Sequence, residues 1–490
     1  MVPSEMYRTS LGLLTDFYQL TMAYAAWKGG IAGKEAVFHL SFRRNPFEGG
    51  YAVAAGLEHA VDYVLQHRFA PDDISYLAAQ TGGDGRPLFE AGFLDWLAVL
   101  KLDVDVDAMP EGTPVFPHEP ILRVRGPVVP CMLLETPLLT IVNFQTLIAT
   151  KAARVVEAAR GEPVIEFGLR RAQGIDGALA ASRAAFVGGC AGTSNVLAGK
   201  LLGIPARGTH AHSWVMLFDD ELEAFFAYAR ALPSNCVLLV DTYDSLEGVR
   251  RAIEVGKWLA ARGHRLVGVR LDSGDLAWLS VQARKLLDEA GLRDTAVMAS
   301  NELDETIVQA LKDQDAAISV WGVGTRLVTG WGDPALGGVY KLSAVRDGPG
   351  APWIYRVKLS EQAGKITIPG VLQVRRFEHA DGFLADVVYD AEMGLPASPE
   401  MVDPLDPTRR RVIPAGTAGG DLLVPVVRRG APAWTSPRLE EIRARTREQL
   451  SRLHGGVKRL VNPHQYPVGL ERGLFDLRTR LVLEARGIAA

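Results

Sequence analysis

The sequence predicts an α/β protein whose centre is an irregular barrel of parallel strands, flanked by a mixed α+β segment and a strand-rich segment. Short β-rich runs alternate with amphipathic stretches of helical length in the middle of the chain. Polar and glycine-rich residues follow each of these runs. The chain has 490 residues, 48% of them hydrophobic, which is enough for two or three domains with buried cores.

The β-rich runs of the central region are PVIEF, VLLVD, RLVGVRLD, TAVMAS and ISVWGVG. Their β-α-β-α order implies parallel strands with helices outside, arranged either as a barrel or as a doubly wound sheet. The residues that follow four of them are DTYD, DSGD, SNELDE and GVGT. Because barrels place their active sites at the C-terminal ends of the strands, this clustering of ligand-type groups favours the barrel.

The segments on either side of the barrel have different patterns. Residues 1–145 are expected to form an α+β domain, since VFHLSF alternates like a strand, VAAGLEHAVDYVL repeats like a helix and TPVFPHEPILRVRGP resembles two strands paired around a turn. Residues 146–345 would form the barrel. Residues 346–490 read as a strand-rich meander with Gly/Pro turns and a charged helix from about Leu439 to Leu453, which we expect to pack on the N-terminal domain.

Charge and cysteine content narrow the function classes. The formal net charge is -4 and the basic residues are thinly spread, so we expect no nucleic-acid partner. The cysteines, which form no metal-binding or disulfide pattern, are Cys131, Cys190 and Cys236. Residues 1–20 lack a basic start followed by an apolar run, so no signal peptide is predicted. A reducing, cytoplasmic location is expected.

The most apolar stretch, Met132 to Thr150, is interpreted as a core helix. It contains Glu135, Asn143 and Gln145, which a bilayer would tolerate poorly but a buried helix can satisfy internally. No membrane partner is therefore expected.

The segment GTHAHSWVM places His210 and His212 two residues apart, beside a threonine and a serine. A histidine can shuttle protons, bind a metal or attack phosphorus, provided that a neighbour holds the imidazole. Such a pair is structural as often as it is catalytic, so the motif alone leaves both readings open.

Two acidic pairs, Asp241/Asp244 and Asp272/Asp275, each follow a strongly apolar run that should be a buried strand. Asp241 and Asp272 lie closer to the strands, where carboxylates could hold Mg²⁺ against a pyrophosphate or stabilise a developing positive charge. For Asp244 and Asp275, N-capping of the next helix is at least as good an explanation.

Two further strand ends suit anions and planar rings. GVGT, with Gly322, Gly324 and Thr325, offers unobstructed backbone N–H groups, and with Ser300 and Asn301 it would make a two-loop phosphate site. EFGLRR supplies an aromatic ring and two guanidinium groups, suited to stacking a ring and pairing with an anion. Packed Phe with solvated arginines is the alternative for EFGLRR.

Together these segments resemble the nicotinate phosphoribosyltransferase family over roughly residues 13–345. The eight matching segments, in order, are LLTDFYQLTMAY, NPFEGGYAVAAGLE, LLETPLLTIVNFQTLIATKAAR, EFGLRRAQG, GTHAHSW, VDTYDS, VRLDSGDL and GVGTRLVT. The resemblance implies the type II phosphoribosyltransferase barrel. After residue 345 the likeness is one of pattern only.

The resemblance implies that nicotinate attacks C1 of phosphoribosyl pyrophosphate and expels pyrophosphate, in a pathway that salvages pyridine for NAD. It implies ATP as co-substrate, hydrolysed through a phosphohistidine at His212, and Mg²⁺ as cofactor. It also implies a homodimer with shared active sites, in which Tyr18 of one subunit and Phe167 of the other sandwich the pyridine ring.

The remaining roles also follow from motif position. Arg170, Thr209 and Arg270 would lie near the pyridine and its carboxylate, and Asp241 and Asp272 beside the ribose and the metal. The residues that match the ribose phosphate site are Ser300, Asn301, Gly322, Gly324 and Thr325.

Ser194 bears on the choice between acid and amide. In GTSN it stands where the related nicotinamide-using enzymes carry an aspartate, which would repel nicotinate. A neutral serine near Arg170 removes that repulsion, and a buried unpaired carboxylate would cost on the order of a few kcal/mol. Nicotinate is therefore expected over nicotinamide.

Two other readings remain open at this stage. A phosphoribosyltransferase that uses quinolinate or nicotinamide would share the barrel but need different groups around the pyridine. A non-catalytic phosphoribosyl sensor would keep the fold without turnover, although the presence of His212, Asp241 and Asp272 together argues against it.

Overall fold

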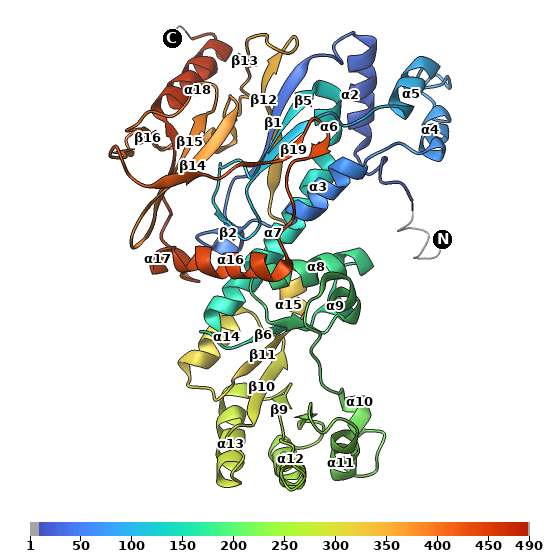
Figure 1. Cartoon of the computed structure of the whole chain (residues 1–490), viewed down its shortest axis with the longest axis vertical. Coiled ribbons are helices and arrows are strands. Elements are labelled where there is room, and N and C mark those ends of the chain that lie inside the picture. Colours follow the sequence, from blue (N-terminus) through green and yellow to red (C-terminus); the bar gives the residue numbers. More distant parts are fainter. Residues whose placement is uncertain (1–8, 489–490) are drawn as a thin grey trace. The chain divides into compact units, whose positions relative to one another are not determined.

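The computed structural model describes residues 9–488. Residues 1–8, which belong to the segment in which the sequence predicts no signal peptide, lie outside the described part. The chain divides into two compact units (Figure 1). The first contains 1–146, 335–438 and 448–490, and the second contains 147–334 and 439–447.

The second unit is built on a six-stranded sheet in the order β7-β6-β11-β10-β9-β8. All five strand pairings in it are parallel, as the alternating sequence pattern predicts. β7 and β8 are the end strands of this order, so the described sheet stays open between them, which fits an irregular barrel. The strands are β6 (Val164–Glu166), β7 (Gly192–Thr193), β8 (Val237–Leu239), β9 (Gly268–Leu271), β10 (Ala296–Asn301) and β11 (Val320–Val323).

Helices and short helical turns follow these strands in chain order. Between and after them lie η2 (Leu169–Arg171), α8 (Ile175–Val187), α9 (Val196–Leu202), α10 (His212–Val215), α11 (Glu221–Ala231), α12 (Ser245–Ala260), α13 (Leu276–Glu289), α14 (Glu305–Asp313) and α15 (Thr325–Val328). Asp244 caps α12 by accepting from the Glu247 N–H at 2.8 Å, and Asp275 caps α13 by accepting from the Trp278 N–H at 3.1 Å. The capping interpretation of these two carboxylates is confirmed.

The first unit contains antiparallel strands from both ends of the chain. Its larger sheet has the order β13-β12-β1-β5-β3-β19-β20, and a second sheet has the order β17-β16-β21-β15-β14-β18. The first sheet comprises β1 (Glu35–Phe42), β3 (Asp105–Ala108), β5 (Leu122–Pro127), β12 (Gly338–Arg346), β13 (Ile354–Tyr355), β19 (Val424–Arg428) and β20 (Ala431–Pro432). The second comprises β14 (Leu372–His379), β15 (Gly382–Asp390), β16 (Glu400–Val402), β17 (Arg410–Val412), β18 (Gly419–Asp421) and β21 (Val468–Glu471).

The chain leaves the larger sheet of this unit and later returns to it. β1 pairs with β12, the strand that follows the barrel, so the chain returns into the N-terminal sheet. The helices are α2 (Phe17–Lys28), α3 (Leu57–Gln66), α4 (Pro71–Ala78), α5 (Ala91–Ala98), α6 (Val128–Leu133), α17 (Gly455–Lys458) and α18 (Arg472–Ala485), while α7 (Glu135–Ala158) and α16 (Leu439–Ser451) cross the division between the units.

One strand pairing differs from the sequence prediction. The run TPVFPHEPILRVRGP forms two strands, but β4 (Pro114–Val115) pairs with β2 (Ala52–Val53), while β5 pairs with β1 and β3. The connecting residues bond to β1 instead, since the His118 N–H donates to Phe42 O at 2.9 Å and the Ile121 N–H to Leu40 O at 2.8 Å. The two strands of the run therefore separate into different sheets.

Among the described residues, the helical stretch Val128–Ala158 is long and apolar enough to cross a bilayer by length and composition. More than half of its most apolar window, 56%, is buried inside the protein. Its polar side chains have internal partners: Glu135 accepts from Gln19 Nε2 at 2.8 Å, and Gln145 Nε2 lies 2.9 Å from His59 Nδ1. These are the contacts that a core helix requires.

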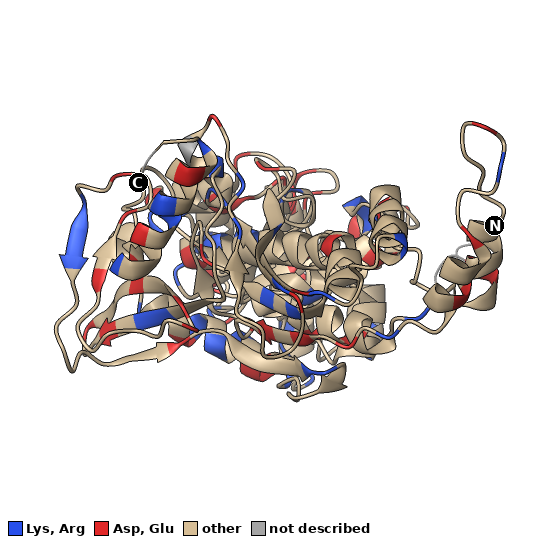
Figure 2. Cartoon of the chain, turned by 90° about the horizontal axis from the view of Figure 1, so that it is seen from above, with Lys and Arg blue, Asp and Glu red and all other residues tan. Residues whose placement is uncertain are grey.

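Figure 2 shows basic and acidic residues interspersed along the ribbon. This is the thin spread of charge expected from the sequence. A few charges are buried, and the best defined of these form a cluster in the first unit. Arg376 binds Asp386 through Nη2 at 2.5 Å, and the Tyr466 hydroxyl donates to Asp386 at 2.9 Å.

Glu119 completes this buried cluster and is fully enclosed. Burial raises the pKa of Glu119 well above its ordinary 4.5, and the nearby Asp386 raises the pKa further. The folded protein therefore retains a proton that the unfolded chain releases.

We predict that wild-type stability falls as pH rises from about 4.5 toward the raised pKa of Glu119, since only the unfolded chain has lost the proton in that interval. Glu119→Gln is neutral at every pH and should remove this slope. Asp386→Asn should destabilise by about 3–5 kcal/mol, because it leaves the Arg376 charge buried without a carboxylate. Urea unfolding between pH 5 and pH 8 measures both. An unchanged slope in Glu119→Gln would contradict the assignment.

Candidate functional site

A cavity of about 470 Å³ opens in the second unit where the parallel strands end. It brings together most of the predicted site residues: Phe167, Arg170, Ser194, Thr209, His212, Arg270, Asp272, Ser300, Asn301, Gly322, Gly324 and Thr325 all line it. Asp241 is not one of the lining residues, but it adjoins them, since its Oδ2 accepts from the Asp272 N–H at 2.8 Å. Tyr18 belongs to the first unit, where its side chain is 48% exposed on α2.

Arg270, in β9, connects several walls of the cavity. Its guanidinium donates to the Thr209 hydroxyl at 2.9 Å, to the Ser300 hydroxyl at 2.8 Å and to Asp272 Oδ1 at 3.1 Å. The guanidinium carbon also lies 5.6 Å from the centre of the Phe167 ring. Because Arg has donors in a fixed fork, one side chain sets the relative positions of all four neighbours.

His212 is the first residue of α10 and projects into the cavity with 41% of its side chain exposed. Its Nδ1 lies 3.2 Å from the Thr242 hydroxyl, and its Nε2 lies 3.9 Å from Asp272 Oδ2. In the tautomer with the proton on Nδ1, the ring donates to Thr242 and leaves the Nε2 lone pair available. This arrangement suits a neutral imidazole nucleophile oriented by a neighbour.

Asp241 has one engaged and one free carboxylate oxygen. Its Oδ2 accepts from the Asp272 N–H at 2.8 Å and from the Ser273 hydroxyl at 2.6 Å. Its Oδ1 is buried and has no hydrogen-bond partner among residues 9–488. A buried oxygen left in this state is costly unless a ligand or a cation completes it.

The described residues contain no group of three or more His, Cys, Asp and Glu side chains that could hold a metal alone. Mg²⁺, however, is commonly held by one or two carboxylates together with waters and substrate phosphates. Asp241 Oδ1 and Asp272 Oδ2 are the oxygens left for this purpose, since Asp272 Oδ1 binds Arg270 and Ser300. The residues present therefore fit Mg²⁺ that is shared with a phosphorylated substrate.

The predicted phosphate loops meet at β10 and β11. Asn301 has a left-handed backbone with φ of 136°, which is unusual for a residue with a side chain, and its Oδ1 accepts from the Glu302 N–H at 2.7 Å. The Thr325 hydroxyl donates to Glu302 Oε1 at 3.0 Å. Glu302 thus accepts the hydrogen bond that the Thr325 hydroxyl would donate to a phosphate. The sequence did not predict this contact.

Comparison with known proteins matches this chain to three descriptions in sequence order. Residues 13–143 match the nicotinate phosphoribosyltransferase N-terminal domain, residues 163–346 the nicotinate phosphoribosyltransferase family, and residues 373–478 its C-terminal domain. The nicotinate phosphoribosyltransferase of Bacillus subtilis is 42% identical over 484 residues, covering 97% of this chain and 96% of the relative. This chain belongs to the nicotinate phosphoribosyltransferase family.

Proteins from other organisms show the same similarity in sequence and in structure. Human nicotinate phosphoribosyltransferase is 36% identical over 522 residues, which cover 95% of each chain. The crystal structure of human nicotinic acid phosphoribosyltransferase superposes with a TM-score of 0.81 at 34% identity, covering 95% of this chain and 99% of that one. The expected type II phosphoribosyltransferase fold is confirmed. A nicotinate-nucleotide pyrophosphorylase from Pyrococcus furiosus shares the fold, with a TM-score of 0.68 at 24% identity.

The aromatic ring of the cavity, Phe167, packs against a glycine. The Phe167 N–H bonds to Val323 O at 2.8 Å, and a Cβ added at Gly322 would lie 2.7 Å from the Phe167 ring. The sequence assigned Gly322 to a phosphate loop. The structure gives it a second task, because only a residue without a side chain leaves room for the ring.

Glu166 is a site residue that the sequence did not single out. It is fully buried and accepts from the Gly168 N–H, from the Ser182 hydroxyl at 2.9 Å and from the Thr193 hydroxyl at 2.5 Å. Its backbone oxygen accepts from the Ser194 N–H at 2.8 Å. Glu166 therefore joins the loop that carries Phe167 to the loop that carries Ser194. A carboxylate within an apolar strand was the available signal.

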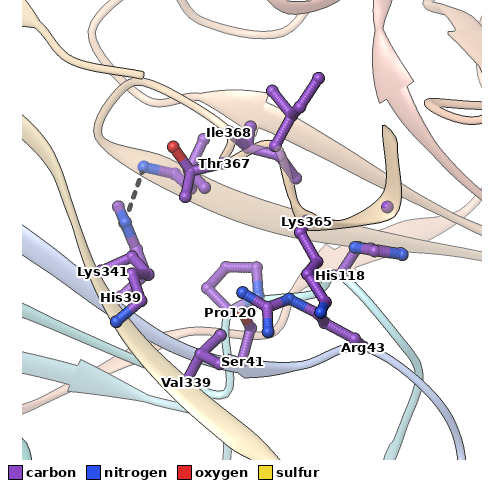
Figure 3. Close-up of a pocket in the computed structure, with 13 residues that line it drawn as sticks. His39, Ser41, Arg43, His118, Pro120, Val339, Lys341, Lys365, Thr367 and Ile368 are labelled. Carbon is purple, nitrogen blue, oxygen red and sulfur yellow. Dashed lines mark hydrogen bonds between the residues drawn. The ribbon is translucent and has the colours of Figure 1, made fainter. Parts of the chain in front are cut away.

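The first unit contains a separate, smaller cavity of about 50 Å³ with a basic lining (Figure 3). Its basic residues are His39, Arg43, His118, Lys341 and Lys365. His39 Nε2 accepts from the Leu372 N–H at 3.1 Å, and burial lowers the pKa of both histidines below their ordinary 6.5. The charge comes from the arginine and the two lysines, which suits an anion such as a phosphate.

We predict that Gly322→Ala displaces the Phe167 ring and raises the KM for nicotinate by about tenfold, since overpacking of this kind costs about 1–3 kcal/mol. Gly177→Ala, in the same unit but with open space at the added Cβ, should leave KM unchanged. Steady-state kinetics of the two variants is the test. Equal KM values for both would show that the ring does not depend on Gly322.

Proposed function

We propose that this nicotinate phosphoribosyltransferase couples the transfer of phosphoribose to ATP hydrolysis through a phosphohistidine at His212, in NAD salvage. The pyridine nitrogen lone pair forms a bond to C1 of phosphoribosyl pyrophosphate while the bond from C1 to the pyrophosphate oxygen breaks. His212 Nε2 separately takes the γ-phosphate of ATP, releasing ADP, and water later removes that phosphate. The observation that supports this most is the geometry of His212, tied at Nδ1 and open at Nε2 in the cavity.

The carboxylates support the sugar chemistry. Departure of pyrophosphate leaves positive charge on the ribose ring, and Asp241 and Asp272 offer negative charge beside it. Mg²⁺, held by Asp241 Oδ1 and Asp272 Oδ2 with substrate phosphates, would neutralise charge on the leaving group. Ser300, Asn301, Gly322, Gly324 and Thr325 would bind the ribose phosphate, with Glu302 leaving the Thr325 hydroxyl as the phosphate arrives.

The pyridine would stack on Phe167, with its carboxylate toward Arg170 and Thr209, in the cavity that Arg270 also lines. Tyr18 would complete the stack from the second subunit of a homodimer. In support of a dimer, α2 exposes a cluster of large apolar side chains, with Phe17 52%, Tyr18 48% and Met22 38% exposed.

A reducing, cytoplasmic setting is proposed for the enzyme. Its three cysteines are all buried and carry no disulfide. Burial raises the pKa of each thiol above the ordinary value, so none is a reactive thiolate.

ATP coupling is tested with His212→Asn. The Asn amide can still donate to the Thr242 hydroxyl but offers no nitrogen nucleophile, so acid-labile protein phosphate and the stimulation of mononucleotide formation by ATP should both disappear. Labelled γ-phosphate and product analysis measure the two quantities. His264→Asn, at a partly exposed histidine of the same unit, is the control and should retain both. ATP stimulation that survives in His212→Asn would refute the phosphohistidine.

The preference for acid over amide is tested at Ser194. Ser194→Asp places a carboxylate near that of nicotinate and should lower kcat/KM for nicotinate by about 100-fold, with less effect on nicotinamide. Ser194→Asn adds similar bulk without charge and should change the ratio little. Competition between the two substrates reads the ratio directly. Parallel losses in both variants would assign the effect to size.

A further inference from the structure

The first histidine of GTHAHSW, His210, has no role in the proposed chemistry, although it too lines the cavity. His210 is only 8% exposed, whereas the side chain of His212 is 41% exposed. The two imidazoles therefore face different surroundings although they are two residues apart. The contacts of His210 show what it does.

Both ring nitrogens of His210 are engaged by the protein. The backbone N–H of Leu239, the last residue of β8, donates to His210 Nε2 at 3.1 Å. Nδ1 lies 3.3 Å from the backbone oxygen of Ala211. The ring packs edge-on against Tyr228 with 4.8 Å between centroids, and its centroid lies 6.2 Å from that of Phe225.

These contacts fix the tautomer. A backbone N–H can only donate, so Nε2 must present its lone pair and the ring proton must be on Nδ1, from which it donates to Ala211 O. Burial, and to a lesser degree the charge of Arg270, lower the pKa of His210 to about 4, although the hydrogen bond to Ala211 acts in the opposite direction. A neutral ring with both nitrogens occupied has no free position for a substrate, a metal or a phosphoryl group.

The bond to Leu239 joins the loop that carries His212 to the end of strand β8. Leu239 is followed closely in the chain by Asp241 and by Thr242, whose hydroxyl contacts His212 Nδ1. His210 thus fixes the histidine-bearing loop to the same strand end that orients the neighbouring imidazole. Thr209, which accepts from Arg270, also holds the loop to the sheet.

We propose that His210 is a positioning residue which, by accepting from the Leu239 N–H, sets the distance of His212 from Thr242 and Asp272. The proposal rests on the proposed function only in that phosphorylation of His212 is its activity readout. Misplacement of a reacting atom by about 1 Å can cost roughly 100-fold in rate. Loss of the His210 acceptor should therefore slow phosphoryl transfer to His212 without changing the KM for nicotinate.

A pair of variants separates this role from simple packing. Gln can place its amide oxygen near the position of Nε2 and accept from the Leu239 N–H, whereas Leu fills similar space and leaves that buried N–H without an acceptor. His210→Gln should phosphorylate His212 within about threefold of the wild-type rate, and His210→Leu about 100-fold more slowly. Equal rates in the two folded variants would overturn the proposal, whether both are fast or both are slow.

A measurement on the unmodified enzyme tests the same contact independently of folding and of ATP coupling. Nitrogen-15 spectra of the histidine rings should show His210 as the neutral Nδ1–H tautomer from pH 5.5 to pH 8, with His210→Gln used to assign the signal. An Nε2–H tautomer or a charged ring in that interval would refute the bond to Leu239. If the wild-type enzyme forms no phosphohistidine, the proposed function fails while this spectrum still decides the role of His210.

Discussion

The ion pair between Arg270 and Asp272 is the interaction on which the rest of the site depends. Arg270 lies in a strand, so its backbone position is fixed by the parallel sheet, and its donors reach Thr209, Ser300 and Asp272. Because Asp272 compensates its charge, Arg270 can lie near the Phe167 ring with only 15% of its side chain exposed. The Arg270 guanidinium therefore positions the side chains around the cavity before any substrate enters.

The segment that carries Phe167 is held by a buried carboxylate, Glu166. Glu166 accepts hydrogen bonds from Gly168, from Ser182 in α8 and from Thr193 in β7, which satisfy a carboxylate that would otherwise be expensive to bury. Phe167 follows it directly and rests against the bare backbone of Gly322. The Phe167 ring is thus confined by Gly322 on one side and lies near the Arg270 guanidinium, so it has little freedom. Such rigidity suits a site that must orient a planar substrate.

The two histidines of one short motif illustrate how environment separates identical side chains. His212 begins a helix, is partly exposed and keeps one nitrogen open toward Asp272. His210 is enclosed by aromatic rings and has both nitrogens engaged. Spacing in the sequence could not distinguish a reactive imidazole from a positioning one, since the distinction lies in burial and in a bond to a strand distant in the chain.

The sequence by itself determined the parallel α/β order and the family, because these depend on local periodicity and on motifs a few residues long. It left capping by Asp244 and Asp275 as one of two interpretations, and the structure decided for it. Only the tertiary structure decided that β4 and β5 belong to different sheets. It also decided that Asp241 bonds to the Asp272 backbone through one oxygen and leaves the other without a partner, and that the Thr325 hydroxyl donates to Glu302. Each of these rests on a hydrogen bond or pairing between residues that local pattern does not relate, and such contacts exist only once the strands are placed.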